Sequence, residues 1–438
     1  MKPGLLSFDE ALAALLAHAG ALTDTEAVDT AAADGRVLAE DIRSALDVPP
    51  RDNTQMDGYA VRAADLVAAA SERPLRLPVA QRIPAGHVGQ ALAAGTVARI
   101  FTGALIPDGA DAVVMQEAVQ LDGETAVFSA PAQPGEWVRR RGEDIAAGSV
   151  ILPAGSRLGP QACGLAASVG CARLTVRRRP RVACFFTGDE LAMPGEPLRP
   201  GAIYNSNRFV LNALLRRLGC EVSDLGIVPD SLEATRRALR EAAAGNDLIV
   251  TSGGVSVGDE DHVRPAVQAE GSITMWQVAI KPGKPLAYGT VRRGGADGGT
   301  TTGGATSGGA SAGASAGASA GAPGGTAHFI GLPGNPVSSF VTFLLFVRPF
   351  IRRLQGMTDT APAAWPMRAD FDWPKPDRRR EFLRVRLNER GGLDLFPNQG
   401  SGVLTSTVWA DGLLDNPPNQ PIARGDTVRF LPLCGLLD

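Results

Sequence analysis

RVACFF at residues 181–186, EVSDLGIV at 221–228 and DLIVTSGG at 247–254 are the stretches that decide the fold. Helical patterns separate them, from Ser206 to Leu218 and from Leu232 to Ala244. Short apolar strands that alternate with helices form a parallel sheet covered by helices on both faces. The sequence therefore predicts a three-layer α/β domain that begins near residue 178.

The strand-to-helix turns of such a sheet are where a site is expected, because ligands bind at the carboxyl ends of the strands. Four turns stand out in this part of the chain. They are TGDE at 187–190, SGGVSVGD at 252–259, KPGKP at 281–285 and GLPGNP at 331–336. The last opens an apolar helix that we expect to reach about Leu354, with its glycines and amides at the helix N-terminus.

Glycines in these turns let the backbone approach a phosphate closely, and Lys281 and Lys284 add positive charge. A single glycine-rich turn is more often purely structural, but several in one domain favour an anion site. Neither GxxxxGK[ST] nor GxGxxG is present, so the motifs leave the ligand unnamed.

Acidic residues stand at similar turns and indicate a hard cation. They are Asp189, Glu190, Asp230, Asp259, Glu260 and Asp261. Carboxylates beside a phosphate repel it unless Mg²⁺ lies between them. Capping of helix N-termini is the alternative for any one of them. For the group we expect cation binding.

The flanking regions are predicted to be β structure. Short apolar runs broken by Gly, Pro and Asp fill residues 75–140, and REFLRVRL and GDTVRFLPL follow residue 357. Residues 294–327 hold only Gly, Ala, Ser and Thr apart from Asp297 and Pro323. Such a tract cannot form a core, and we expect a flexible insertion between two strands.

Composition excludes several classes of protein. Lys and Arg total 43 against 46 Asp and Glu, so no basic field favours nucleic acid or a membrane surface. The five cysteines lack metal-site spacing, and we expect buried, reduced thiols in a cytoplasmic protein. Ser7 and Glu10 form a capping-box pattern, so the N-terminus is predicted to be a helix rather than a signal peptide. No apolar run approaches the roughly 20 residues of a membrane span.

Residues 52–60, DNTQMDGYA, are polar and turn-prone, and Asp57 with Gly58 is explained locally as a turn. Together with other strings they resemble the MoeA and gephyrin E-domain family of molybdopterin molybdenumtransferases. The strings are DNTQMDGYAV, FTGALIPDGADAVVMQE, RRRGEDI, FTGDEL, IYNSN, SGGVSVGDEDH, KPGKP, GLPGNPVSS, REFLRVRL, QGSG and ADGLL, in the family's order and spacing over almost the whole chain.

The resemblance implies an elongated homodimer with four domains per subunit. These are a discontinuous N-terminal domain (1–52 and 141–177), an inserted β domain (53–140), a molybdopterin-binding α/β domain (178–356, with the 294–327 insertion) and a C-terminal β-barrel (357–438). In the family the site lies between the α/β domain of one subunit and the N-terminal half of the other.

The family's site residues match positions of this sequence one by one. Asp57 and Thr102 are expected to reach the site from the partner chain and, with Glu190 and Asp261, to act in catalysis. Glu190, Asp230 and Asp261 match acidic positions linked to Mg²⁺ or nucleotide. The remaining substrate-binding positions are Gly253, Gly254, Lys281, Lys284, Pro333, Asn335 and Pro336, together with Arg384 and Ser401, which resemble part of a molybdate site.

The activity that the resemblance implies is insertion of molybdate into adenylylated molybdopterin, with Mg²⁺-dependent release of AMP. The molybdopterin adenylyltransferase and recipient molybdoenzymes are the implied protein partners. Two rival functions are the adenylyltransferase of the preceding step and a gephyrin-like scaffold. Two departures are visible: Gln277 follows Trp276 where some members have Lys, and the 294–327 tract is present.

Overall fold

The computed structural model describes residues 5–254, 262–294 and 325–437. The chain forms two compact units, which we describe separately. The larger comprises residues Met1–Glu26, Gly35–Ala39 and Val176–Asp438, and the smaller comprises Ala27–Asp34 and Glu40–Thr175. The strands β1 (Thr25–Asp29) and β12 (Arg173–Arg177) pair with each other where the chain passes between the units.

The larger unit contains the predicted α/β sheet, in the strand order β16-β13-β17-β21-β20-β18. Its strands are β13 (Arg181–Thr187), β16 (Glu221–Val228), β17 (Leu248–Ser252), β18 (Gly271–Gln277), β20 (Pro285–Arg292) and β21 (Thr326–Leu332). The first four in spatial order are parallel, as predicted. β20 is antiparallel to both of its neighbours, β21 and β18, so the sheet is mixed and not fully parallel as predicted. Antiparallel neighbours need only a short connection, whereas parallel neighbours need a crossover of a dozen or more residues.

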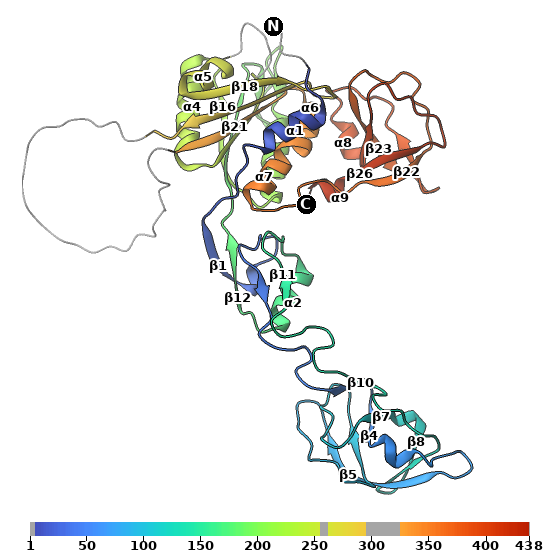
Figure 1. Ribbon diagram of the computed structural model, residues 1–438. Coiled ribbons are helices and arrows are strands. Elements are labelled where there is room, and N and C mark those ends of the chain that lie inside the picture. Colours follow the sequence, from blue (N-terminus) through green and yellow to red (C-terminus); the bar gives the residue numbers. More distant parts are fainter. Residues whose placement is uncertain (1–4, 255–261, 295–324, 438) are drawn as a thin grey trace, which may run out of the picture. The chain divides into compact units, whose positions relative to one another are not determined.

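Helices cover both faces of this sheet (Figure 1). One face carries α1 (Phe8–Leu16), α3 (Ser206–Arg217), α6 (Pro336–Thr342) and α7 (Arg348–Leu354), and the other carries α4 (Leu232–Gly245) and α5 (Val263–Glu270). Alternate residues of β13 enter the two cores: Cys184 and Phe186 on the α3 side, Phe185 on the α4 side. The three-layer prediction is therefore confirmed.

The helix after GLPGNP ends at Leu354, as expected, but a π-helical turn at Phe343–Val347 interrupts it. At the N-terminus the predicted capping box is present, because Ser7 Oγ accepts from the Glu10 amide and the Glu10 carboxylate accepts from the Ser7 amide. In the part of the chain that the structure describes, no helix has both the length and the apolarity needed to cross a bilayer.

The C-terminal residues of the larger unit form a closed barrel. Its strands are β22 (Trp365–Ala369), β23 (Arg380–Leu387), β24 (Gly392–Leu395), β25 (Gly412–Asn416) and β26 (Thr427–Pro432), with α8 (Thr405–Trp409) and α9 (Leu433–Leu437) beside them. β25 pairs with both β26 and β23, and this closes the ring. The short strand β19 (Ile280–Lys281) joins the barrel from outside by pairing with β23.

The smaller unit is mostly β structure. Its main sheet has the order β7-β4-β6-β5-β9-β8. The strands are β4 (Gly58–Val61), β5 (Leu75–Ile83), β6 (Val97–Ile100), β7 (Ala112–Met115), β8 (Val119–Asp122) and β9 (Thr125–Phe128). β2 (Ile42–Arg43) and β3 (Asn53–Thr54) precede this sheet in sequence and pair with β11 (Val150–Leu152) and β10 (Val138–Arg139), which follow it; α2 (Pro160–Ser168) completes the unit. The main sheet is therefore inserted in sequence between two segments, before and after it, that pair with each other.

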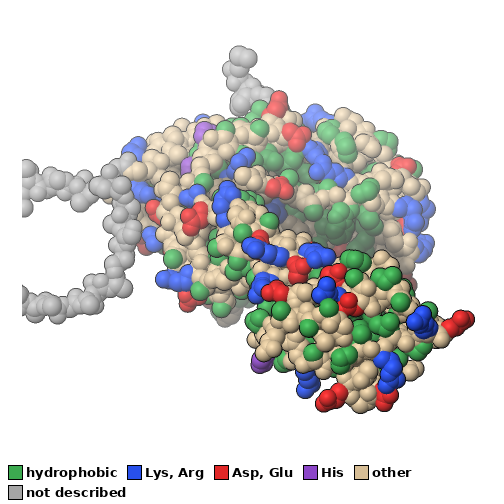
Figure 2. All heavy atoms as spheres, turned by 60° about the horizontal axis from the view of Figure 1, so that its bottom comes forward, with side chains coloured by type: hydrophobic (Ala, Val, Ile, Leu, Met, Phe, Trp, Pro, Cys, Tyr) green, Lys and Arg blue, Asp and Glu red, His purple; other side chains and the backbone are tan. Residues whose placement is uncertain are grey.

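Surface charge and thiols bear on the sequence interpretation. Basic and acidic side chains are interspersed over the face drawn in Figure 2.

All five cysteines are free, but only Cys184 and Cys220 are buried, and Cys434 is exposed. The expectation that the thiols are all buried is therefore wrong, because Cys434 lies on the short terminal helix α9 rather than in a core.

Candidate active site

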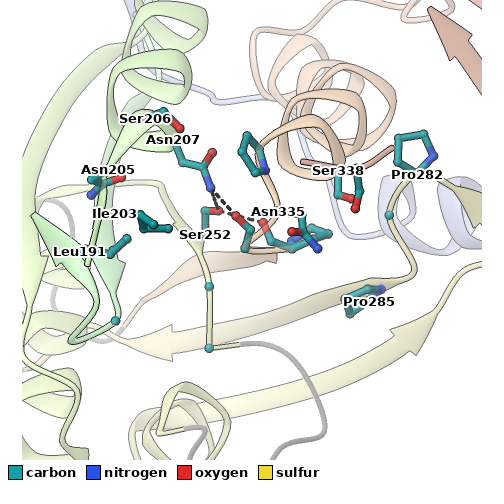
Figure 3. Close-up of a pocket in the computed structure, with 18 of the residues that line it drawn as sticks. Leu191, Ile203, Asn205, Ser206, Asn207, Ser252, Pro282, Pro285, Asn335 and Ser338 are labelled. Carbon is teal, nitrogen blue, oxygen red and sulfur yellow. Dashed lines mark hydrogen bonds between the residues drawn. The ribbon is translucent and has the colours of Figure 1, made fainter. Parts of the chain in front are cut away.

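The carboxyl ends of β13, β17 and β21 open onto a cavity of about 850 Å³. All four turns selected from the sequence contribute to its wall. The predicted site residues that line it are Glu190, Asp230, Gly253, Gly254, Lys281, Lys284, Pro333, Asn335, Pro336 and Ser401. Figure 3 shows Leu191, Ile203 and Asn205 on one side of this cavity and Pro282, Pro285 and Ser338 on the other. Chain segments distant in sequence therefore meet at one place.

Two of the lining turns require glycine. Gly253 has φ +100°, and a Cβ there would lie 3.0 Å from the carbonyl oxygen of Thr187. Gly283 has φ +95°, and its Cβ would lie 2.6 Å from Thr342 Oγ1. Left-handed backbone and close approach together exclude a side chain at both positions. The turns hence keep their backbone exposed toward the cavity.

Asn207 connects three lining segments, although it carried no role in the sequence interpretation. Its Nδ2 donates to Ser252 Oγ (2.9 Å) and to the carbonyl oxygen of Gly334 (2.8 Å) (Figure 3). Ser252 Oγ in turn donates to the Pro333 carbonyl at 2.9 Å. The start of α3, the end of β17 and the turn after β21 are thereby fixed to one another. IYNSN appeared among the matching strings, but nothing in its pattern indicates these partners.

The KPGKP turn joins the α/β sheet to the barrel. It lies between the strands β19 and β20, not between a strand and a helix as predicted. Lys281 Nζ lies 3.2 Å from Glu381 Oε1 and 3.4 Å from Asp377 Oδ2. Arg379, which also lines the cavity, forms a bidentate pair with Asp377. That guanidinium is the main cause holding the pKa of Asp377 well below its usual range.

Lys284 differs from Lys281 in its electrostatic surroundings. Within the described residues Lys284 Nζ has no carboxylate partner, whereas Lys281 has two. An ammonium group that is already paired attracts an incoming anion less strongly than one that is not. Of the two predicted lysines, Lys284 is therefore better suited to meet an anion in the cavity.

Two of the three predicted metal ligands line the cavity. Glu190 follows β13, Asp230 follows β16, and Asp261 lies outside the described residues. Over the residues that the structure describes, no group of three or more His, Cys, Asp or Glu side chains has an arrangement that holds a metal. Two hard oxygen ligands beside an anion site are still the donor type that Mg²⁺ requires. The residues present are compatible with a shared carboxylate and phosphate site.

Arg384 and Ser401 take different positions. Ser401 lines the cavity, and its carbonyl oxygen accepts the Val337 amide of α6 at 2.9 Å. Arg384 is buried in the barrel and donates to Ser406 Oγ and to the carbonyl oxygens of Phe382 and Gly400. Burial lowers the pKa of its guanidinium. The structure therefore places Arg384 behind Gly400, a lining residue, rather than in the wall itself.

Asp57 and Thr102 lie together in the smaller unit. Asp57 Oδ1 accepts from the Thr102 amide (2.8 Å) and from Thr102 Oγ1 (2.7 Å). The backbone bond is the largest cause that lowers the pKa of Asp57, and the hydroxyl bond adds to it. Asp57 is half-buried and Thr102 is exposed. The two residues therefore form one local feature of the smaller unit, which the sequence interpretation did not include.

Comparison with known proteins identifies the family. Residues 6–170 match the MoeA N-terminal region (domain I and II), residues 183–353 the probable molybdopterin binding domain, and residues 366–433 the MoeA C-terminal region (domain IV). A molybdopterin molybdenumtransferase from Haemophilus influenzae is 36% identical over 441 residues, covering 99% of this chain and 100% of that protein. The chain belongs to the molybdopterin molybdenumtransferase family.

Other relatives agree. A molybdopterin molybdenumtransferase from Nostoc sp. is 40% identical over 418 residues, 94% of this chain and 89% of its own. The crystal structure of a molybdopterin biosynthesis MoeA protein from Pyrococcus horikoshii superposes with a TM-score of 0.79 at 28% identity, covering 98% of this chain and all of that one. This molybdenumtransferase therefore has the multidomain α/β plus β fold of the family and acts in molybdenum cofactor biosynthesis.

Proposed function

We propose that this molybdenumtransferase inserts molybdate into adenylylated molybdopterin and releases AMP in a Mg²⁺-dependent reaction. One observation carries the proposal. Glycine-rich turns, Lys284, which has no carboxylate partner among the described residues, and two carboxylates that follow separate strands line one cavity at the carboxyl ends of the sheet. An anion site with a place for a hard cation is the arrangement that cleavage of a pyrophosphate requires.

Binding of the pyrophosphate falls to the turns and to Lys284. Gly253 and Gly254 leave the backbone open to close approach, and Asn335 and Pro336 begin α6 at the cavity. Helix N-termini and glycine-rich turns favour phosphate, and a lysine adds a full charge. These groups would neutralise the substrate and hold it for in-line attack, so covalent catalysis is unnecessary.

Mg²⁺ would be held by Glu190, Asp230 and Asp261, and when bound it would offset the charge that develops on the phosphates. The side chain of Glu190 is confined by its neighbour, because a Cβ on Gly188 would lie 2.5 Å from Glu190 Oε2. A bulkier residue at 188 would therefore displace this carboxylate. The glycine keeps room for the ligand.

Asp57 and Thr102 are proposed to act at the site of a partner subunit in a homodimer. Their mutual hydrogen bonds occupy Asp57 Oδ1 and leave Oδ2 without a bond from Thr102. A carboxylate with a lowered pKa stays ionised at neutral pH and can orient or deprotonate an attacking water. Heterodimers of subunits that carry different substitutions can test this role.

Molybdate is proposed to dock beside the dithiolene before the pyrophosphate is cleaved, while the adenylate still holds the pterin. Lys284 and Ser401 line the cavity and are suitable donors to a tetrahedral dianion. Arg384 would act through the loop that it holds, since its guanidinium bonds to the Gly400 carbonyl. We assign Arg384 a positioning role in the molybdate site.

A cytoplasmic location and encounters with the molybdopterin adenylyltransferase and recipient molybdoenzymes complete the proposal. Five free cysteines suit a reducing compartment. The substrate must come from an adenylylating enzyme, and the product must pass to an apoenzyme that uses molybdenum.

Incubation with adenylylated molybdopterin, molybdate and Mg²⁺ tests the proposal. We expect AMP release that requires all three components, and no consumption of ATP in a parallel incubation with molybdopterin, ATP and Mg²⁺. Consumption of ATP with formation of adenylylated molybdopterin would identify the preceding adenylyltransferase. Absence of both reactions, with a folded dimer, would identify a scaffold. A Gly253→Val variant, in which the side chain meets Thr187, serves as the inactive control.

A further inference from the structure

Two arginines of the smaller unit stand directly opposite each other on neighbouring strands. In the parallel pairing of β5 with β6, Arg82 is the register partner of Arg99. Adjacent strands lie about 4.8 Å apart, so the two side chains rise side by side from the same face. Like charges in directly opposite positions destabilise a sheet. Repulsion between Arg82 and Arg99 therefore lowers the stability of this sheet, unless a bound anion offsets their charge.

Neither arginine lies within ion-pair distance of a carboxylate among the described residues, although the charge of Arg99 does act on Asp57. Instead both guanidinium groups pack on Phe101, whose ring centroid lies 4.7 Å from the Arg82 Cζ and 4.5 Å from the Arg99 Cζ. Arg99 also donates to the Gly58 carbonyl at 2.8 Å. Packing on an aromatic ring fixes the guanidinium planes without cancelling their charge.

This cluster adjoins Asp57 and Thr102. Phe101 precedes Thr102, and Gly58, to which Arg99 is bonded, follows Asp57. The positive charge of Arg99 contributes to the lowered pKa of Asp57. Arg99 also donates to the Ile100 carbonyl and to Gln116 Oε1, whereas Arg82 makes no hydrogen bond among the described residues and keeps its donors for a ligand. Two oriented cations thus stand beside the residues that we propose for catalysis.

We propose that Arg82 and Arg99 form an anion-recognition site that takes phosphate oxygens of the adenylylated substrate. The inference rests on the proposed function, because it adds binding residues beside Asp57 and Thr102. Two neighbouring guanidinium groups match a pyrophosphate, which carries charge on two linked phosphorus centres, and each offers paired N–H donors. Molybdate shares the tetrahedral oxyanion chemistry, and the experiment separates the two sources.

Arg82→Gln is the informative variant, because Arg82 is exposed and makes no hydrogen bond among the described residues. Arg76→Gln is the matched control, since Arg76 lies on the same strand and pairs with Asp122 at the surface. Full-length proteins are compared for the Kd and KM of adenylylated molybdopterin, the KM of molybdate and the melting temperature. Arg82→Lys tests whether the stacked planar group is needed in addition to the charge.

We expect Arg82→Gln to raise the Kd and KM for adenylylated molybdopterin about tenfold, as loss of a charge-assisted contact does. Its melting temperature should stay the same or rise, because a like-charge pair is removed. A lower melting temperature with unchanged affinity would show a structural role and overturn the inference. A raised KM for molybdate alone would overturn the assignment to pyrophosphate. If the wild type itself releases no AMP, the proposed function fails, whereas an active wild type with Arg82→Gln equal to Arg76→Gln refutes only this site.

Discussion

Lys281 Nζ lies 3.2 Å from Oε1 of Glu381, a carboxylate with no exposed side-chain surface. The two residues are also register partners in the pairing of β19 with β23. One ion pair therefore fastens the KPGKP turn of the cavity to the barrel. Trp373 Nε1 and Asn416 Nδ2 bind the other oxygen of Glu381, so the carboxylate is held from both sides.

Replacement of Glu381 by Gln should show how much the ion pair with Lys281 contributes to stability, apart from the hydrogen bonds that Glu381 accepts from Trp373 and Asn416. Glu381→Gln keeps an oxygen for Trp373 but removes the charge that faces Lys281. We expect a loss of about 1–3 kcal/mol in unfolding free energy, because the partly buried ammonium of Lys281 loses the nearer of its two carboxylate partners and keeps only Asp377. Urea unfolding measures it. Glu389→Gln, at an exposed position of the same barrel, is the control and should change stability by less than about 0.5 kcal/mol. Equal effects of the two substitutions would show that the ion pair contributes nothing.

Asp57→Asn should fold normally and lose molybdenum insertion. Asparagine retains the oxygen that accepts from the Thr102 amide and hydroxyl, so the turn survives. The loss of the ionised carboxylate should lower kcat by about a hundredfold or more. AMP release measures the rate, and near wild-type activity would make Asp57 an ordinary turn residue.

Mixed dimers extend this test. A heterodimer of Asp57→Asn and Lys284→Ala subunits should regain about half of the wild-type dimer's activity, if each site takes one residue from each chain. Each variant alone should be inactive. No recovery in a verified heterodimer would refute the proposal that Asp57 serves a partner subunit.

Stability should fall on acidification through His328. Burial is the main cause that lowers the pKa of this imidazole below 6.5, and the charges of His18 and Arg293 act in the same direction while Asp247 opposes them. Tyr288, at 3.0 Å from His328 Nδ1, has its pKa raised to about 12 by burial and stays protonated. A depressed folded pKa means that the unfolded chain binds the proton more readily.

The stabilising contribution of neutral His328 is therefore complete above about pH 6.5 and is lost as pH falls from there through the folded pKa. His328→Gln should make the unfolding free energy less dependent on pH between about 7.5 and 5.5. His87→Gln, at an exposed position, is the control and should keep the wild-type slope. The same slope in His328→Gln would contradict the account.

The tract at 294–327 should be replaceable by a short Gly-Ser turn. Its interior lies outside the described residues, but the strands that flank it are paired up to Arg292 and Thr326. Two adjacent antiparallel strand ends can be closed by a two-residue turn. Fold and AMP release should be unchanged. A drop of more than about tenfold in AMP release, or roughly 1.4 kcal/mol, with an unchanged melting temperature would mean that the tract gates the site.

Local patterns predicted much of this architecture. The alternation of apolar strands and amphipathic helices indicated β13, α3, β16, α4 and β17, because each element's period is set by its own residues. The carboxyl ends of those strands then located the cavity. Most of the proposed residues of the larger unit consequently line one space.

Long-range pairing accounts for what the sequence did not reveal. Lys281 meets Asp377 and Glu381 across about a hundred residues, and neither lysine of KPGKP shows locally which one is paired. In REFLRVRL nothing distinguishes the buried Arg384 from the exposed Arg386. The antiparallel order of β20 and β18 likewise depends on the sheet rather than on either strand.

The most direct test of the central claim is the ratio of molybdenum incorporated to AMP released in a single turnover. Purified enzyme, adenylylated molybdopterin, molybdate and Mg²⁺ are mixed, and metal bound to the dithiolene and free AMP are quantified in the same samples. Insertion coupled to cleavage predicts one molybdenum for each AMP and no AMP release without molybdate. AMP released with no molybdenum on the pterin would contradict the account.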